Sequence, residues 1–296
     1  MDGWIEVEDG YSVWYRIAGG GPGDPGRNRT PLLVLHGGPG CGYDYLEPLE
    51  ALAAHRPVVF YDQLGSGRSD RPDDPGRWVI DRFVREIDLM RCALGLKRVH
   101  LLGHSWGGWL AIEYLTTCPA GPAAAGVERA VLASTSASLA AFEAETRRLR
   151  ALLPAEARAA LDEGDATGHV TSDAYNQAAD QFYARHVCRL AEWPEPMLRT
   201  IANLEGNQSY EVMQGPNELV ITGNLRTWDR TADLTRIDVP TLVTCGRHDE
   251  MGPPCAGALV EAIPAAELAV FEHSSHTAQL EEPEAYLATV AAFLRG

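Results

Sequence analysis

The residues whose types and spacing are best suited to catalysis lie in the segment Val99-His-Leu-Leu-Gly-His-Ser-Trp-Gly-Gly108. Within it, residues 103–107 fit the pattern G-x-S-x-G, which places a nucleophilic serine at a sharp turn from a strand to a helix. Glycines are required on both sides of Ser105, because side chains there would collide with the neighbouring strand and helix. The turn also places the Ser105 hydroxyl at a helix N-terminus, where unpaired N–H groups favour developing negative charge. We therefore expect Ser105 to be a catalytic nucleophile.

A serine nucleophile requires a base and an acid, and the motif alone also occurs by chance in ordinary Gly-Ser turns. Asp249 and His276 each follow a predicted strand, and the chain order serine, aspartate, histidine is that of α/β-hydrolases. In this arrangement His276 takes the proton of Ser105, and Asp249 fixes the imidazole tautomer and stabilises its positive charge. His273 is the alternative base and Glu250 the alternative acid.

The segment His36-Gly-Gly-Pro-Gly40 meets the need for an oxyanion hole. One N–H donor is expected from Trp106, the residue after the nucleophile. The other is expected from Gly38, where the lack of a side chain leaves the backbone open to a substrate carbonyl. The segment Asp62-Gln-Leu-Gly-Ser-Gly-Arg-Ser69 is interpreted as a structural turn that braces the site.

Strands and helices that alternate along the chain must position these residues. A continuous apolar run, typical of a strand buried on both faces of a parallel sheet, occurs at 31–35, and a second buried strand is predicted at 57–61. Further strands are predicted at 99–102, 127–133, 240–246 and 268–271. Helical spacing of apolar residues occurs at 43–54, 78–95, 109–115, 254–263 and 283–294. Alternating residues at 4–8 and 11–17 predict a hairpin at a sheet edge. The sequence therefore predicts an α/β fold with a mainly parallel sheet.

Residues 136–229 have a different character, because they are helical, rich in Ala, Arg and Glu, and lack a buried strand. We interpret them as a helical cap inserted into an α/β-hydrolase core made of residues 1–135 and 230–296. Pro154 is expected at a helix start and Gly164 just past the end of that helix. Further helices are expected at 172–187 and 195–204.

The composition limits the possible partners and location. The 296-residue chain has a formal net charge of -16, which argues against binding to nucleic acid or to an anionic membrane surface. The N-terminus lacks the features of a secretory signal, and no apolar run is long enough to cross a membrane. The six cysteines are scattered and form no C-x-x-C pair, which indicates separate thiols in a reducing compartment. A cytoplasmic location is expected.

Five motifs together resemble the proline iminopeptidase family of α/β-hydrolases. They are His36-Gly-Gly-Pro-Gly40, Asp62-Gln-x-Gly-x-Gly-x-Ser69, Gly103-His-Ser-Trp-Gly-Gly108, Gly246-Arg-His-Asp249 and Ser275-His276. These motifs span nearly the whole predicted core. The resemblance implies a serine aminopeptidase that removes an N-terminal residue without a metal or cofactor.

The segment Tyr210-Glu-Val-Met-Gln-Gly-Pro-Asn-Glu218 is similar to a cap segment of the tricorn-associated aminopeptidases of this family. The similarity implies that Glu218 binds the free amine of the substrate, that Glu250 is the second amine-binding carboxylate, and that Tyr210 belongs to the same pocket. A physical argument supports this assignment. Two carboxylates held close together repel each other until a cation joins them, so a buried pair rewards an ammonium group.

The sequence thus predicts hydrolysis of an amide bond next to a free α-amine, in a short peptide or a small molecule. An alternative is an amino-acid amide hydrolase that removes an aminoacyl group from an intermediate of natural-product biosynthesis. A large apolar channel under residues 136–229 favours this alternative, and a short polar pocket favours dipeptides. An esterase or lipase-like hydrolase is an alternative for which Glu218 and Glu250 are unfavourable. A non-catalytic binding protein is disfavoured by the complete set of Ser105, Asp249 and His276.

Overall fold

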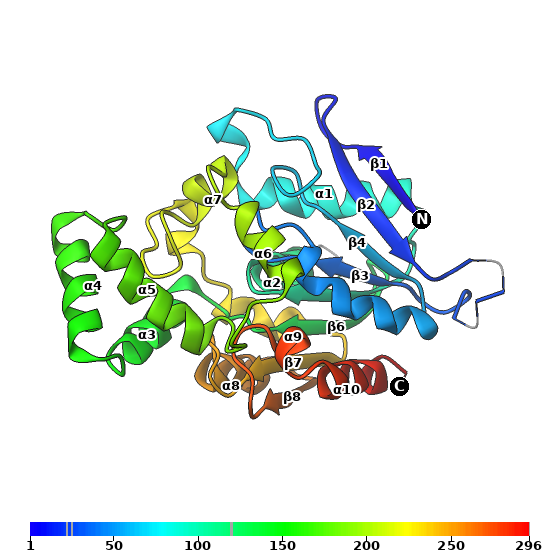
Figure 1. The fold of residues 1–296 in the computed structure, drawn as a ribbon. Helices are drawn as coiled ribbons and strands as arrows, with labels where there is room; N and C mark the ends of the chain where they lie inside the picture. Colours follow the sequence, from blue (N-terminus) through cyan, green and yellow to red (C-terminus); the bar gives the residue numbers. More distant parts are fainter. Residues whose placement is uncertain (22, 25, 119–120, 296) are drawn as a thin grey trace.

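The computed structural model describes residues 1–21, 23–24, 26–118 and 121–295, and an eight-stranded sheet forms its centre (Figure 1). The strands are β1 (Asp2–Glu6), β2 (Ser12–Ala18), β3 (Leu32–Leu35), β4 (Val58–Tyr61), β5 (Val99–His104), β6 (Val127–Ala133), β7 (Thr241–Gly246) and β8 (Ala266–Phe271). Their order across the sheet is β1-β2-β4-β3-β5-β6-β7-β8. The β1–β2 and β2–β4 pairs are antiparallel and the other pairs are parallel. The predicted mainly parallel sheet with an N-terminal edge hairpin is confirmed.

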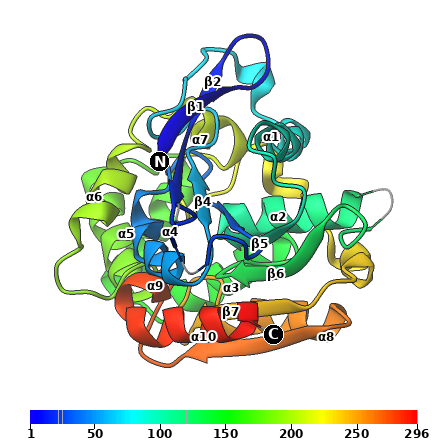
Figure 2. The ribbon, with the colours of Figure 1, turned by 90° about the vertical axis from the view of Figure 1, so that its right-hand side faces the viewer.

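Both faces of the sheet are covered, which explains the continuous apolar runs of its central strands. On one face Leu33 and Leu35 of β3 share an apolar cluster with residues of α1 (Ile80–Ala93), α2 (Trp106–Thr117) and α8 (Pro253–Ala262). On the other face Leu32 and Val34 share a cluster with residues of the 3₁₀ helix η1 (Asp44–Ala54), α9 (Ala278–Glu281) and α10 (Pro283–Arg295). Figure 2 shows α1, α2 and α8 on one side of the sheet and α9 and α10 on the other.

Between β6 and β7 the chain leaves the sheet and forms helices. They are α3 (Leu139–Arg150), α4 (Ala155–Thr167), α5 (Asp173–His186), α6 (Glu195–Ala202), α7 (Gln208–Met213) and the short 3₁₀ helices η3 (Asn224–Thr227) and η4 (Thr231–Arg236). Helices α3, α4 and α5 lie at the end of the molecule opposite both chain termini (Figure 1). Apolar side chains of these helices form a third cluster, which includes Leu161, Tyr175 and Phe182 and is separate from the two clusters of the sheet.

One local prediction was wrong, and one predicted helix is of a different type. Gly164 lies inside α4, which continues to Thr167 and ends at Gly168, a glycine with a left-handed φ of 74°. A Cβ at position 164 would lie 2.3 Å from Cδ2 of Tyr175, so this glycine is required for the contact between α4 and α5. The predicted helix at 43–54 is a 3₁₀ helix rather than an α-helix, and Pro48 within it lacks the N–H that an α-helix needs.

All six cysteines are free thiols. Cys188, Cys245 and Cys255 are buried, whereas Cys92 is exposed. Among the described residues, no helix is both long enough and apolar enough to cross a membrane.

Candidate active site

Ser105 occupies a strained turn between β5 and α2. Its φ of 58° and ψ of -124° are rare for a residue with a side chain. A Cβ at Gly103 would lie 2.1 Å from the carbonyl oxygen of Gly107, and a Cβ at Gly107 would lie 2.1 Å from the carbonyl oxygen of Leu35 in β3. The two glycines are therefore required for the close approach of helix and strand, as the sequence predicts. The turn lets Ser105 line a cavity of about 590 Å³.

Two backbone N–H groups beside Ser105 are available to an oxyanion. The N–H of Gly37 donates to the Tyr45 hydroxyl at 2.8 Å, so it is already used. Within the described part of the chain, no acceptor is bonded to the N–H of Gly38 or of Trp106. Gly38 has a φ of 112°, and a Cβ there would lie 2.6 Å from the nitrogen of Gly40. The backbone of Gly38 thus needs glycine, and the residue lines the same cavity as Ser105.

Gln63 connects the two loops that carry these N–H groups. Its side-chain Nε2 donates to the carbonyl oxygen of His36 at 3.0 Å, and its Oε1 accepts the indole N–H of Trp106 at 2.8 Å. Its backbone N–H donates to Nε2 of His36 at 2.9 Å. The turn at residues 62–69 therefore has the bracing contacts that the sequence predicts for it.

His276 and Asp249 are directly bonded, with 2.8 Å between Nδ1 and Oδ1. Oδ1 of Asp249 also accepts the N–H of Met251 at 2.9 Å. Burial alone raises the pKa of Asp249, but the charge of His276 and these hydrogen bonds hold it below its usual value. Burial alone lowers the pKa of His276, but Asp249, followed by Glu250 and Glu218, raises it to about 9. Ser105 and His276 line the same cavity.

The two alternative residues occupy other positions. His273 is exposed, and its backbone N–H donates to Glu282 at 3.0 Å. Oε1 of Glu250 lies 3.8 Å from Nε2 of His276, so Glu250 approaches the ring nitrogen opposite to the one that Asp249 holds. The position of the acid beside Nδ1 is filled by Asp249.

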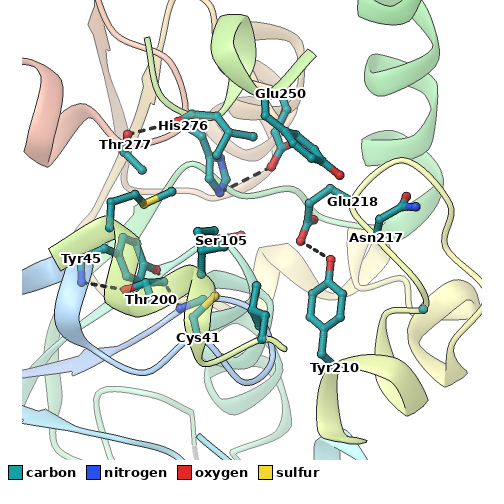
Figure 3. Close-up of a pocket in the computed structure, with 18 of the residues that line it drawn as sticks. Cys41, Tyr45, Ser105, Thr200, Tyr210, Asn217, Glu218, Glu250, His276 and Thr277 are labelled. Atoms are coloured by element: carbon teal, nitrogen blue, oxygen red, sulfur yellow. Dashed lines mark hydrogen bonds and ion pairs between the residues drawn. The ribbon is translucent and has the colours of Figure 1, made fainter. Parts of the chain in front are cut away.

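The three residues implied in amine binding line the same cavity (Figure 3). The Tyr210 hydroxyl donates to Oε1 of Glu218 at 2.6 Å, and Oε2 of Glu218 lies 3.5 Å from Nε2 of Gln214. Glu250 is buried, and its Oε2 has no hydrogen-bond partner among the described residues. Figure 3 shows Glu218 and Glu250 on the same side of the cavity, with Ser105 and His276 beside them. The arrangement leaves carboxyl oxygens available to a donor that enters the cavity.

Both carboxyl groups hold protons more strongly than in water. Loss of hydration raises the pKa of Glu218, although the Tyr210 hydrogen bond and His276 lower it. Burial raises the pKa of Glu250 well above its usual value; His276 opposes this shift, and the charges of Glu218 and Asp249 add to it. His276 is the cationic neighbour that lowers the pKa of both carboxyl groups, and burial outweighs its effect.

Several positioning residues have no signal in the sequence. Nε2 of His104 donates to the carbonyl oxygen of His276 at 2.8 Å, and Nδ1 accepts the Tyr45 hydroxyl at 2.8 Å. The hydroxyl in turn accepts the N–H of Gly37, so these bonds leave one tautomer for His104. The carbonyl oxygen of His186, the last residue of α5, accepts the N–H groups of both Glu250 and His276 at 3.2 Å. The inserted helices are thus tied directly to the loops that carry these side chains.

Apolar side chains also line the cavity. They belong to residues from the end of α5 to the segment after α6, namely Val187, Trp193, Met197, Ile201 and Leu204. Ile201 is 42% exposed, so the apolar wall continues to the surface. The cavity lining therefore combines acidic and apolar side chains.

Comparisons with known proteins identify the family of this chain. The family model described as alpha/beta hydrolase fold matches residues 30–283. A proline iminopeptidase of Heyndrickxia coagulans is 38% identical over 99% of this chain and 98% of its own length. A proline iminopeptidase of Levilactobacillus brevis is 40% identical over 96% of this chain and 93% of its own length.

Two solved structures match the whole chain. The proline iminopeptidase of Mycobacterium smegmatis superposes with a TM-score of 0.91 and 36% identity, covering 100% of this chain and 98% of the other. The protein VinJ superposes with a TM-score of 0.92 and 35% identity, with the same coverage. The strand order, the serine turn and these likenesses lead to one conclusion: the chain is an enzyme that belongs to the proline iminopeptidase family of α/β-hydrolases.

Proposed function

We propose that this enzyme is a serine aminopeptidase of the prolyl aminopeptidase type, which cleaves the amide bond after an N-terminal residue that has a free α-amine. The observation that carries the proposal is the pair Glu218 and Glu250, which line the same cavity as Ser105. An esterase has no use for two poorly hydrated carboxyl groups beside its nucleophile. An aminopeptidase needs them, because it must distinguish a terminal ammonium group from an internal amide.

In the proposed reaction, Ser105 Oγ attacks the carbonyl carbon of the N-terminal residue while Nε2 of His276 takes the hydroxyl proton. The N–H groups of Gly38 and Trp106 stabilise the oxyanion of the tetrahedral intermediate. The C–N bond then breaks, and His276 gives its proton to the leaving amine. Water attacks the acyl-enzyme with His276 again as base, which releases the amino acid and restores the Ser105 hydroxyl.

The substrate ammonium is proposed to bind between Glu218 and Glu250. Glu250 contributes its unpartnered Oε2, and Glu218 is oriented by the 2.6 Å hydrogen bond from Tyr210. A cation at this position offsets the repulsion of the two carboxylates, which favours their charged forms. The distance between the ammonium site and Ser105 then limits cleavage to the first amide bond.

The test compares prolyl and alanyl p-nitroanilides with their N-acetylated forms. Acetylation removes the ammonium charge, and we expect it to lower kcat/KM by at least about 100-fold, since a lost charge-assisted contact in a buried site costs about 3 kcal/mol or more. Glu218→Gln is expected to raise KM for the free amines. Glu211→Gln is the matched control, because Glu211 is an exposed glutamate on the same cavity. Equal turnover of acetylated and free substrates would contradict the proposal.

A second candidate concerns the leaving group. The apolar wall formed by Trp193, Met197 and Ile201 suits a bulky apolar amine better than the charged carboxylate end of a dipeptide. An aminoacyl amide of a lipophilic amine is therefore proposed as a substrate class. For the preferred N-terminal residue, kcat/KM is expected to rise with the apolar length of the leaving amine. Ile201→Asp should reverse this order without a change for the p-nitroanilide of the same residue.

A further inference from the structure

A second cavity lies at the opposite end of the parallel strands from Ser105. Basic side chains line it, although the protein as a whole is acidic. The cavity measures about 600 Å³ and includes the residues at the starts of β5 and β6. His100 lies near the start of β5 and Ser105 follows its end, so roughly 16 Å of strand separates them. Five arginines line this cavity, in a chain with 25 basic and 41 acidic residues: Arg29, Arg56, Arg98, Arg129 and Arg295.

The positive charge at this cavity is only partly balanced. Of the two acidic residues that line it, Glu128 forms an ion pair with Arg98, and Asp238 accepts the N–H of Ala123 at 3.2 Å. Within residues 1–21, 23–24, 26–118 and 121–295, no carboxylate lies within ion-pair distance of Arg29, Arg56 or Arg129.

Arg56 is the most unusual of these arginines, because it is 4% exposed. Its guanidinium donates to the carbonyl oxygens of Thr30 at 3.1 Å and Leu294 at 2.6 Å. Neutral carbonyl groups orient the guanidinium but do not balance its charge. Burial, together with the charges of Arg29 and Arg129, lowers the pKa of Arg56. A buried cation without a counter-charge is costly, and an anion in the cavity would offset that cost.

His100 supplies an independent indication of a ligand. Its side chain is 5% exposed and lines the same cavity, and its Nδ1 has no hydrogen-bond partner among the described residues. Its Nε2 lies 3.9 Å from Oε2 of Glu128, which is too long for a hydrogen bond. Burial and the charges of Arg56, Arg129 and Arg98 lower the pKa of His100 to about 3, so the ring is neutral at pH 7. A neutral imidazole can donate one N–H to an anion that the arginines hold.

We propose that this cavity binds a multiply charged oxyanion of the phosphate class, either free or as part of a small phosphorylated molecule, through Arg29, Arg56, Arg129 and His100. The guanidinium fork matches the geometry of phosphate oxygens, and several forks around one cavity favour a polyanion over a single carboxylate. The site is distinct from the cavity of Ser105 and does not depend on the proposed aminopeptidase activity.

The test measures the Tm of the whole protein in inorganic phosphate, pyrophosphate and chloride at constant ionic strength. Because a ligand that binds the folded state stabilises it by RT ln(1 + [L]/Kd), a concentration ten times the Kd should raise the Tm by roughly 2–4 °C, and above the Kd the rise should follow the logarithm of the concentration. The general stabilisation by phosphate as an excluded salt instead increases steadily with concentration and does not follow its logarithm. A stronger effect of pyrophosphate at equal concentration indicates a site for a larger phosphorylated molecule, and an equal effect indicates a site for the free ion.

The variant Arg29→Gln/Arg129→Gln removes two surface-accessible arginines of the cavity and is expected to abolish the logarithmic rise in Tm, with aminopeptidase activity unchanged. Arg226→Gln, an exposed arginine of η3 outside this cavity, should keep the rise. The second readout is the NMR signal of the His100 ring, which should shift on addition of phosphate. A logarithmic rise that the double variant retains would overturn the proposal, and so would a Tm and a His100 signal that do not respond to either anion.

Discussion

Oε1 of Glu250 lies 3.8 Å from Nε2 of His276, while Oδ1 of Asp249 lies 2.8 Å from Nδ1 of the same ring. The imidazole therefore has an acidic neighbour at each nitrogen. These neighbours raise the pKa of His276 to about 9 against the effect of burial. Because His276 accepts the Ser105 proton only when it is neutral, the free enzyme at pH 7 holds this base mainly in its inactive, protonated form.

We predict that a fluorophosphonate, which has no ammonium group, labels Ser105 faster as the pH rises, with half of the maximal rate near pH 9. Glu250→Gln removes a negative neighbour of His276 and should move this midpoint to lower pH. Glu211→Gln should leave it in place, because Glu211 is exposed and solvent screens its charge. The measurement is the rate constant of labelling across a pH series. A midpoint that is identical in the wild type and in Glu250→Gln would show that the carboxyl group has no influence on the base.

An aminoacyl substrate should behave differently from the phosphonate. Its ammonium, placed between Glu218 and Glu250, offsets their negative charge and lowers the pKa of His276 in the complex. We therefore predict that the lower midpoint of the kcat profile for a prolyl or alanyl p-nitroanilide lies at least about one pH unit below the labelling midpoint, since one unit corresponds to about 1.4 kcal/mol of interaction. Coinciding midpoints would exclude a coupling between amine binding and the base.

Ser105→Ala is predicted to lower kcat by roughly 10⁶-fold, the scale found when a serine nucleophile is removed. The methyl group occupies the same strained turn, so the Tm should stay within a few degrees of the wild type. The Kd of an aminoacyl amide should be retained, because the proposed ammonium contacts are intact. Cys41 lines the same cavity, but burial raises the pKa of its thiol well above the usual value, so it cannot replace the serine. Turnover within tenfold of the wild type would assign the nucleophile to another residue.

A pair of glycine substitutions tests the close packing behind the serine turn. Gly107→Ala places a methyl group 2.1 Å from the carbonyl oxygen of Leu35, and neither backbone can move without disrupting β3 or α2. We expect a loss of at least about 3 kcal/mol in the free energy of unfolding, or no folded protein. Gly257→Ala, in open space within α8, should stabilise the protein by about 0.5–1 kcal/mol because alanine favours the helix. Urea unfolding of both variants provides the comparison.

The elements that the sequence predicted well are those with strong local signals. Strand β3 is buried on both faces and every residue in it is leucine or valine, a pattern typical of a short strand in a parallel sheet. The wrong end of α4 has an equally physical cause. A glycine inside a helix and a glycine after it look the same in a sequence, and the reason for Gly164 is Tyr175 on another helix.

Part of the site was predictable because its motifs are local in the sequence. The rest was not, because it depends on contacts between residues that are far apart in the sequence. The turn at Ser105 and the glycines at 37–38 carry their own signals. The bond of Tyr45 to His104 joins residues 59 positions apart, and Tyr45 fits the apolar spacing of η1 equally well without it. The approach of Glu218 to Glu250 likewise depends on how the inserted helices fold over the sheet, which single-residue patterns do not encode.

The hydroxyl of Tyr45 accepts the N–H of Gly37 and donates to Nδ1 of His104, both at 2.8 Å. Tyr45→Phe leaves these two buried polar groups without a partner, which should cost about 1–3 kcal/mol in the free energy of unfolding. Gly37 directly precedes the proposed oxyanion donor Gly38, and His104 holds the carbonyl oxygen of His276. Loss of the hydroxyl should therefore lower kcat and leave KM within about twofold, because the ammonium contacts of Glu218 and Glu250 are untouched.

Tyr15→Phe, a partly exposed tyrosine of β2 away from the cavity, is the control and should change neither kcat nor KM. If kcat of Tyr45→Phe equals that of the wild type while the stability falls, the hydroxyl supports the fold alone and does not position the catalytic groups.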